Sequence, residues 1–265
     1  MPQLEIRKTA LMWLSETNAV IKAAGVQAFG LNVLDYKIEP HVQLSTTLTI
    51  PGCPEKPVLV SPLNVKKRSM RTVEGRAALV HALSHIEFNA INLALDAIWR
   101  FSEMPEAYYL DWLKVAKEEA YHFSLLNSHL ASLGFQYGDF TGHNSLWEMV
   151  DRTKGDVLAR MALVPRTMEA RGLDANPALR SKLAQAGDAK AAEIMDIILT
   201  DEIGHVAIGN HWFNYLCEKD NLDPLSTFAQ LCNTYSAPKL RGPFNLEARR
   251  KAGFSEAELS HLSQV

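Results

Sequence analysis

Two short motifs of the form Glu-x-x-His could bind metal ions. Glu119 and His122 form the first motif, and Glu202 and His205 form the second. Both motifs lie in stretches with helical periodicity, and residues three apart in a helix lie on the same face. Each motif can therefore present one carboxylate and one imidazole to the same ion.

A single glutamate precedes each motif at nearly the same distance. Glu87 lies 32 positions before Glu119, and Glu169 lies 33 positions before Glu202. One glutamate on each of two helices, with Glu-x-x-His on each of two others, is the ligand pattern of ferritin-like dinuclear proteins. The sequence therefore predicts an all-α fold, a ferritin-like four-helix bundle. The 50 positions from Glu119 to Glu169 leave room for a long crossover between its two hairpins.

The charges of these six side chains indicate which metals they would hold. Four carboxylates and two neutral imidazoles balance two divalent cations, whereas four buried carboxylates without metal would cost several kcal/mol each unless protonated. An oxygen-rich site with one histidine per ion suits iron or manganese. We therefore expect two Fe ions, with Mn or a mixed Fe/Mn pair as the alternative and Zn only as an adventitious occupant. No organic cofactor and no catalytic residue beyond the ligands is predicted.

Some assignments in this site have alternatives. An isolated Glu-x-x-His is most often a polar surface pair, but both motifs here have apolar flanks. Glu148 competes with Glu169 as the ligand from the third helix, and the matched spacing favours Glu169. Metal-bound histidines usually donate their second N–H to a carboxylate or carbonyl. We expect Asp201 to serve His122, and Glu118 to serve His205.

The elements that must position these residues can be read from periodicity and capping signals. Residues 25–68 lose the helical period and contain five prolines, four of them after Ile50, which indicates an irregular arm, with Leu44–Ile50 as a candidate strand. The predicted domains are an N-terminal helix and arm (1–71), the bundle (72–219), and a helical and irregular tail that packs on it (220–265). Helices are predicted over 7–24, 73–102, 105–133, 189–218 and 224–235, and a last one follows the Ser255-x-x-Glu258 capping box. A further helix is predicted to start at Ser145, with a kink at Pro165. It is expected to break at 172–177 and to resume over 177–186.

Composition sets limits on partners and location. The net charge is -3 and 47% of the residues are hydrophobic, so neither a nucleic acid nor a membrane surface is indicated as the main partner. No run of 18 uncharged apolar residues occurs, so no membrane span is expected. Cys53, Cys217 and Cys232 are widely spaced, which argues against disulfides and favours a cytoplasmic location.

Several stretches resemble a bacterial family of ferritin-like proteins of unknown function. The resemblance extends from about residue 50 to the end and rests on 74–79, 85–87, 118–123, 163–174, 201–209 and 242–254. The segment around Glu169 is also similar, more distantly, to the bacterial di-iron hydroxylase that modifies a tRNA base. That similarity favours Glu169 over Glu148 and leaves tRNA open as a partner, but neither resemblance supplies a substrate.

Three functions remain open at this point. The first is an O2- or peroxide-activating oxidoreductase of the hydroxylase or oxygenase type, with an unidentified small-molecule substrate, an electron donor and a pocket near Glu169. The second is ferritin-like iron handling or peroxide scavenging. The third is a non-enzymatic interaction protein stabilised by its metal. A homodimer is compatible with all three.

Overall fold

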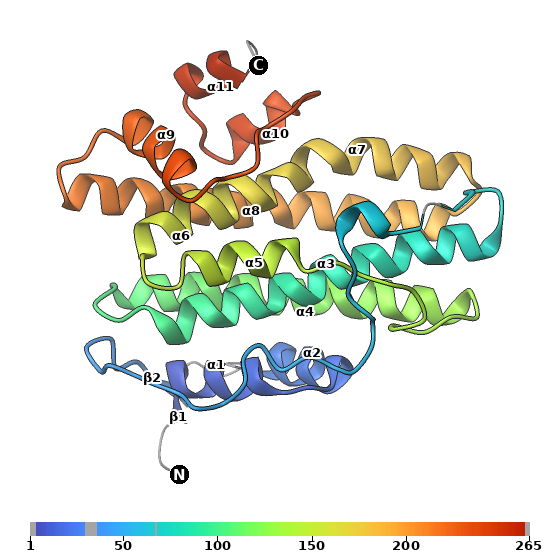
Figure 1. The fold of residues 1–265 in the computed structure, drawn as a ribbon, viewed down its shortest axis with the longest axis horizontal. Helices are drawn as coiled ribbons and strands as arrows, with labels where there is room; N and C mark the ends of the chain where they lie inside the picture. The colour runs from blue at the N-terminus through green and yellow to red at the C-terminus, as the bar shows by residue number, and fades with distance from the viewer. Residues whose placement is uncertain (1–3, 30–35, 67, 263–265) are drawn as a thin grey trace. The chain divides into compact units, whose positions relative to one another are not determined.

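The structure is a computed structural model that describes residues 4–29, 36–66 and 68–262. Helices make up most of this part of the chain, and its one sheet pairs two-residue strands β1 (Leu4–Glu5) and β2 (Tyr36–Lys37) in parallel. The predicted all-α class is confirmed. The chain divides into two compact units, Met1–Trp147 and Glu148–Val265, which are described separately (Figure 1). The predicted division at residues 71/72 and 219/220 stays a prediction. Across the described ranges, no helix has the length and apolarity to cross a membrane.

The first unit is built on two long consecutive helices, α3 (Val73–Arg100) and α4 (Glu106–Ser132), which pack along each other. The hydroxyl of Thr72 caps α3 by accepting from the N–H of Gly75. Gly134, at φ +86°, follows the end of α4 in the left-handed conformation that glycine adopts without strain. Both helices agree with the predicted bounds to within two residues, because their sequences combine a long apolar pattern with clear end signals.

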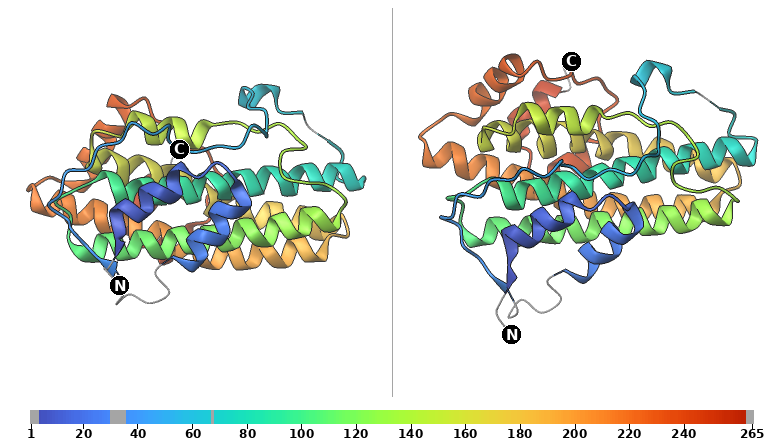
Figure 2. Two further views of the ribbon diagram at one scale, coloured as in Figure 1. Left: turned by 90° about the horizontal axis from the view of Figure 1, so that it is seen from below. Right: turned by 60° about the horizontal axis from the view of Figure 1, so that its bottom comes forward.

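The N-terminal residues form two helices where the sequence predicted one over 7–24. These are α1 (Ile6–Ser15), which packs on α3, and α2 (Ala19–Ala28), which packs on α4 (Figure 2). Asn18 separates them, because its side chain accepts from the N–H groups of Val20 and Ile21 and so starts a new helix. The candidate strand at Leu44–Ile50 is wrong, since this stretch carries no strand; a short 3-10 turn, η2 (Pro62–Asn64), follows it.

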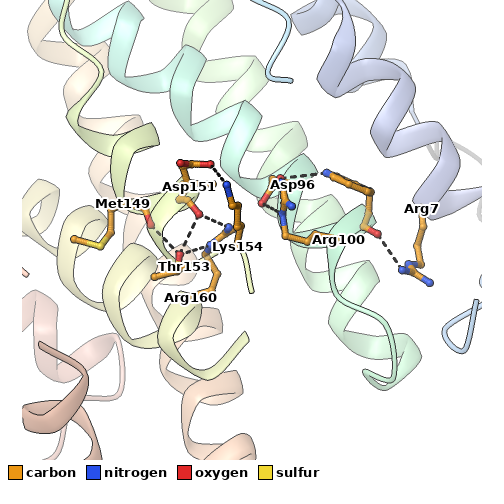
Figure 3. Close-up of polar contacts among 10 residues, drawn as sticks. Arg7, Asp96, Arg100, Met149, Asp151, Thr153, Lys154 and Arg160 are labelled. Carbon is orange, nitrogen blue, oxygen red and sulfur yellow. Dashed lines mark hydrogen bonds and ion pairs between the residues drawn. The ribbon is translucent and has the colours of Figure 1, made fainter. Parts of the chain in front are cut away.

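Two buried cations fix this N-terminal region to α3. The ammonium of Lys22 donates to the carbonyls of Leu14 and Gly52 and to the side chain of Asn92. The guanidinium of Arg7 donates to the carbonyls of Val42 and Trp99. Figure 3 shows Arg7 near the end of α3, beside the ion pair between Asp96 and Arg100.

The third predicted helix is divided in the structure. Helix α5 (Ser145–Arg152) ends before a turn, and α6 (Val157–Leu163) starts anew with Asp156 as its cap. The buried guanidinium of Arg160 donates to the hydroxyl of Thr153 and to the carbonyl of Val150 (Figure 3). The continuous helix predicted from Ser145 is therefore wrong, because capping and these hydrogen bonds stabilise a turn inside it.

The second unit contains the largest departure from the sequence prediction. After α6 the chain forms a π-helical segment, η3 (Val164–Glu169), and then α7 (Ala170–Gln185) runs unbroken through Gly172 and Pro177. The predicted kink at Pro165 corresponds to η3, but the predicted break at 172–177 is wrong. Pro177 cannot donate to the carbonyl of Leu173, and the side-chain amide of Asn245 donates to that carbonyl instead. A distant segment thus compensates for the helix breaker.

The rest of the second unit packs on α7 and on α8 (Ala189–Lys219), which matches the predicted helix at 189–218. Helices α9 (Pro224–Thr234), α10 (Leu246–Lys251) and α11 (Glu256–Leu262) follow (Figure 1). Helix α10 lies within a stretch expected to be irregular. The capping box of α11 is confirmed, because Ser255 and Glu258 exchange hydrogen bonds. Apolar side chains of α10 and α11 share one core with α7 and α8, formed by Ala170, Leu173, Val206, Ala248, Ala252, Phe254, Leu259 and Leu262.

Candidate metal centre

Three of the predicted ligands meet in the interior of the first unit. Helix α3 supplies Glu87, and α4 supplies Glu119 and His122 on one face. The Nδ1 atom of His122 lies 3.4 Å from Glu87 Oε2 and 3.4 Å from Glu119 Oε2. One ligand atom from each residue lies within 4.8 Å of the others, which is close enough for all three to hold one metal ion.

All three ionisable side chains of this cluster are buried, which is unusual for side chains that serve only to hold the fold together. Glu119 and His122 are 0% exposed and Glu87 is 3% exposed. Burial, and then the charge of Glu119, raise the pKa of the Glu87 carboxyl to about 8. Burial would lower the pKa of His122, but its contacts with Glu119 and Glu87 outweigh burial and raise it. The metal-free cluster therefore holds protons at neutral pH that a cation would replace.

The apolar surroundings explain why the cluster sits inside the unit. Phe88 follows Glu87 and Phe123 follows His122, and their rings pack against each other with centroids 6.1 Å apart. These two buried rings add apolar surface beside the ligands on α3 and α4. The donor set of two carboxylates and one imidazole fits a divalent iron or manganese ion.

The second unit contains the other predicted ligands. Glu202 and His205 lie one turn apart on α8, with Glu202 Oε1 4.0 Å from His205 Nδ1, and both are buried. Glu169 is the last residue of η3 and is also buried. Glu148 is exposed and belongs to α5, a separate helix. Burial therefore favours Glu169 over Glu148, and a π-helical turn is a frequent feature of functional sites.

The predicted hydrogen-bond partners of the two histidines are partly exposed. Glu118 accepts from Lys114 Nζ at 2.6 Å, one turn earlier on the surface of α4. Asp201 precedes Glu202 on α8 and is intermediate in burial. Their proposed contacts with His205 and His122 stay predictions.

Sequence reasoning missed two polar groupings. In the first unit, His85 Nδ1 lies 2.8 Å from the hydroxyl of Tyr137, and the ring of Tyr137 packs against Phe88 and Phe123. In the second unit, the buried Arg166 pairs with Glu258. In the sequence, Arg166 lies one turn before Glu169, and Glu258 belongs to a capping box. Nothing in their spacing indicates that Arg166 and Glu258, which are 92 residues apart, form a pair.

Comparison with known proteins gives a family and one curated relative. The profile of a family described as "Protein of unknown function (DUF455)" matches residues 14–260. A protein of Haemophilus influenzae, named "Uncharacterized protein", is 51% identical over 236 residues, which cover 86% of this chain and 82% of the relative. No solved structure matches the chain.

Proposed function

Because the chain belongs to the family of proteins of unknown function DUF455, which carries no assigned reaction, we propose its function from the site itself. We propose a di-iron carboxylate protein that activates O2 or peroxide, an oxidoreductase of the hydroxylase or oxygenase type acting on an organic substrate. The buried cluster of Glu87, Glu119 and His122 is the observation that carries this proposal.

The proposed centre contains six ligands in two halves. Glu87, Glu119 and His122 form one half, and Glu169, Glu202 and His205 form the other. The support is the repeated order of a single glutamate and then Glu-x-x-His, at spacings of 32 and 33 positions, with all six side chains buried. On this proposal α3, α4, the η3–α7 segment and α8 are the four helices of a ferritin-like bundle.

Two iron ions would supply the redox chemistry, and the chain would supply ligands, charge balance and exclusion of water. Glu87 has the raised pKa expected of a carboxyl that exchanges its proton for a cation on loading. Phe88 and Phe123, which are both buried and follow the ligands Glu87 and His122 in sequence, would help to exclude water from the first half of the site. An external electron donor would be required for hydroxylation, because insertion of one oxygen atom into a C–H bond supplies only two of the four electrons that reduce O2. The other two would come from the donor as the second oxygen atom leaves as water.

The test is anaerobic loading with Fe(II), followed by exposure to O2 and detection by optical and Mössbauer spectroscopy. We expect two irons per chain that are magnetically coupled after oxidation. Two uncoupled irons would contradict a shared centre and indicate separate mononuclear sites. Oxidation by peroxide with no effect of any organic substrate would favour iron handling or peroxide scavenging. Iron that binds but reacts with neither oxidant would favour a structural metal.

Matched histidine variants show which residues hold the iron. We expect His122→Asn and His205→Asn each to lower the iron content and to abolish the coupled spectrum. His129→Asn on α4 and His211→Asn on α8 are the controls, because neither residue is buried. Unchanged iron content in His122→Asn would remove the basis of the proposal.

A further inference from the structure

The second unit contains a pocket of about 730 Å³ between η3, α9 and the C-terminal helices. This volume lies within the range of small-molecule sites, which are mostly apolar with a few converging polar groups. Phe228 and Phe254 supply aromatic surface, and Cys232 supplies a thiol whose pKa is raised by burial and which therefore stays neutral. Most of the wall is thus suited to an apolar body.

Arg166 is a buried cation in the pocket wall, and removing its charge from water costs free energy. Arg166 is 3% exposed, and its Nε donates to no acceptor within the described ranges. The guanidinium lies over the rings of Phe213, Phe228 and Phe254, at 4.5, 4.8 and 5.2 Å from their centroids. Burial lowers its pKa to about 10, so it is still charged at neutral pH. A buried cation with an unused N–H needs an anion in good geometry.

The charge of the neighbouring Arg249 is fully paired within the protein. Arg249 also lines the pocket and lies on Phe254, 5.2 Å from the ring centroid. Its guanidinium forms a bidentate pair with Asp174, with N–O distances of 3.0 and 2.6 Å. Arg249 is therefore neutralised inside the protein, and the charge open to a ligand is that of Arg166.

Among the described residues, the one carboxylate that pairs with Arg166 is that of Glu258, which also caps α11. Glu258 contacts Arg166 through Oε1, while its Oε2 accepts from the N–H and the hydroxyl of Ser255 in the capping box of α11. Glu258 can keep the cap without Arg166, because the cap uses the other oxygen. Lys239, exposed on the pocket wall, adds a second positive charge. The pocket is therefore positive overall, with a replaceable internal anion.

We propose that this pocket binds a small organic anion, a carboxylate or phosphate ester with an apolar or aromatic body, whose anionic group pairs with Arg166 in place of Glu258. The apolar body lies against Phe228 and Phe254. The proposal rests on residues of the second unit alone and does not require the metal centre. Arg166 and Glu169 share η3, so a ligand here would contact the segment that carries a proposed iron ligand.

The test compares anionic and neutral probes of the same shape. Benzoate, phenyl phosphate and octanoate are titrated into the full-length protein by calorimetry, beside benzamide and octanamide. We expect benzoate and octanoate to bind at least about tenfold more tightly than their amides, the effect of one charge-assisted pair. Equal affinity of acids and amides, or no binding of any probe at millimolar concentration, would overturn the proposal.

Variants connect the binding to the proposed residues. Arg166→Gln is expected to remove the preference for the acid, whereas Arg180→Gln, on the exposed surface of α7, leaves it unchanged. Glu258→Gln is expected to strengthen anion binding several-fold, because glutamine keeps the cap but no longer competes for Arg166. Ala229→Trp, a bulky group on the pocket wall, is expected to block all probes. If Arg166→Gln folds, as judged by circular dichroism, and still prefers the acids, Arg166 is not the anion site. If it does not fold, an unchanged affinity in Glu258→Gln overturns the proposal.

Discussion

The ring of Pro165 occupies the space that a side chain at position 209 would need. A Cβ atom added to Gly209 would lie 2.4 Å from Pro165 Cβ and 2.6 Å from its Cγ. Helix α8 and the π-helical segment η3 therefore approach each other closely at this point. The contact lies four residues before Glu169 and four residues after His205, so it sets the spacing of two segments that carry proposed ligands.

Replacement of this glycine is expected to disturb the contact. Gly209→Ala should lower the free energy of unfolding by about 1–3 kcal/mol, the usual cost of overpacking a rigid interior. Gly172→Ala is the control within α7, because nothing lies within 4 Å of its added Cβ, and it should be neutral or slightly stabilising. Urea denaturation measures both. A Gly209→Ala protein as stable as the wild type would show that η3 can move away.

The buried hydrogen bonds of Arg7 make a second prediction. Arg7→Met keeps the apolar stem but leaves the carbonyls of Val42 and Trp99 without this donor. We expect a loss of about 2–4 kcal/mol, since each buried acceptor without a donor costs about 1–3 kcal/mol. Lys8→Met, at an exposed neighbouring position, should change stability by less than about 0.5 kcal/mol. Similar denaturation midpoints for the two variants would contradict this role for Arg7.

The compensation of Pro177 by Asn245 can be measured as a coupling. Asn245→Asp keeps an oxygen that caps α10 and removes the amide that donates to the carbonyl of Leu173. Pro177→Ala restores a backbone N–H that can donate to the same carbonyl. We expect Asn245→Asp to cost about 1 kcal/mol less in the Pro177→Ala background than in the wild type. Additive effects of the two changes would mean that the carbonyl of Leu173 finds another donor.

The protonation of Glu87 predicts how metal affinity depends on pH. Its pKa is raised to about 8, so the metal-free carboxyl carries a proton at pH 6.5 and must release it to bind a cation. Affinity for Fe(II) is therefore expected to fall as the pH is lowered from 8 to 6.5, by up to about tenfold per pH unit for each proton released. Anaerobic calorimetry in buffers of different ionisation enthalpy measures the protons. If the affinity for Fe(II) does not depend on pH and no proton is released, the Glu87 carboxyl is not protonated in the metal-free protein.

The sequence predicted the elements whose signals are local. Helices α3, α4 and α8 follow from long apolar patterns with caps at Thr72 and Asp188 and a glycine stop at Gly134. The Glu-x-x-His motifs follow from the same periodicity, and in the first unit Glu87, Glu119 and His122 lie close enough to hold one metal ion. These features depend on neighbours within a few positions, which sequence reasoning can use.

The remainder depends on distant residues. The continuity of α7 through Pro177 depends on Asn245, and the turn before α6 depends on Arg160 as well as on the cap at Asp156. The pocket at Arg166 is formed by segments from α9 and α11 that have no spacing relation to η3. A sequence pattern shows that proline disfavours a helix, but it does not show which side chain donates to the carbonyl that the proline leaves without a partner.

The position of Lys22 has a consequence for truncated forms of the protein. Its ammonium joins α2, the arm at Gly52 and Asn92 in the middle of α3 in one set of hydrogen bonds. A fragment that begins at residue 72 would expose the sides of α3 and α4 that α1 and α2 cover, and would leave Asn92 without its ammonium donor. Such a fragment should self-associate, so the long helices that carry the first three ligands need the N-terminal 71 residues to remain monodisperse.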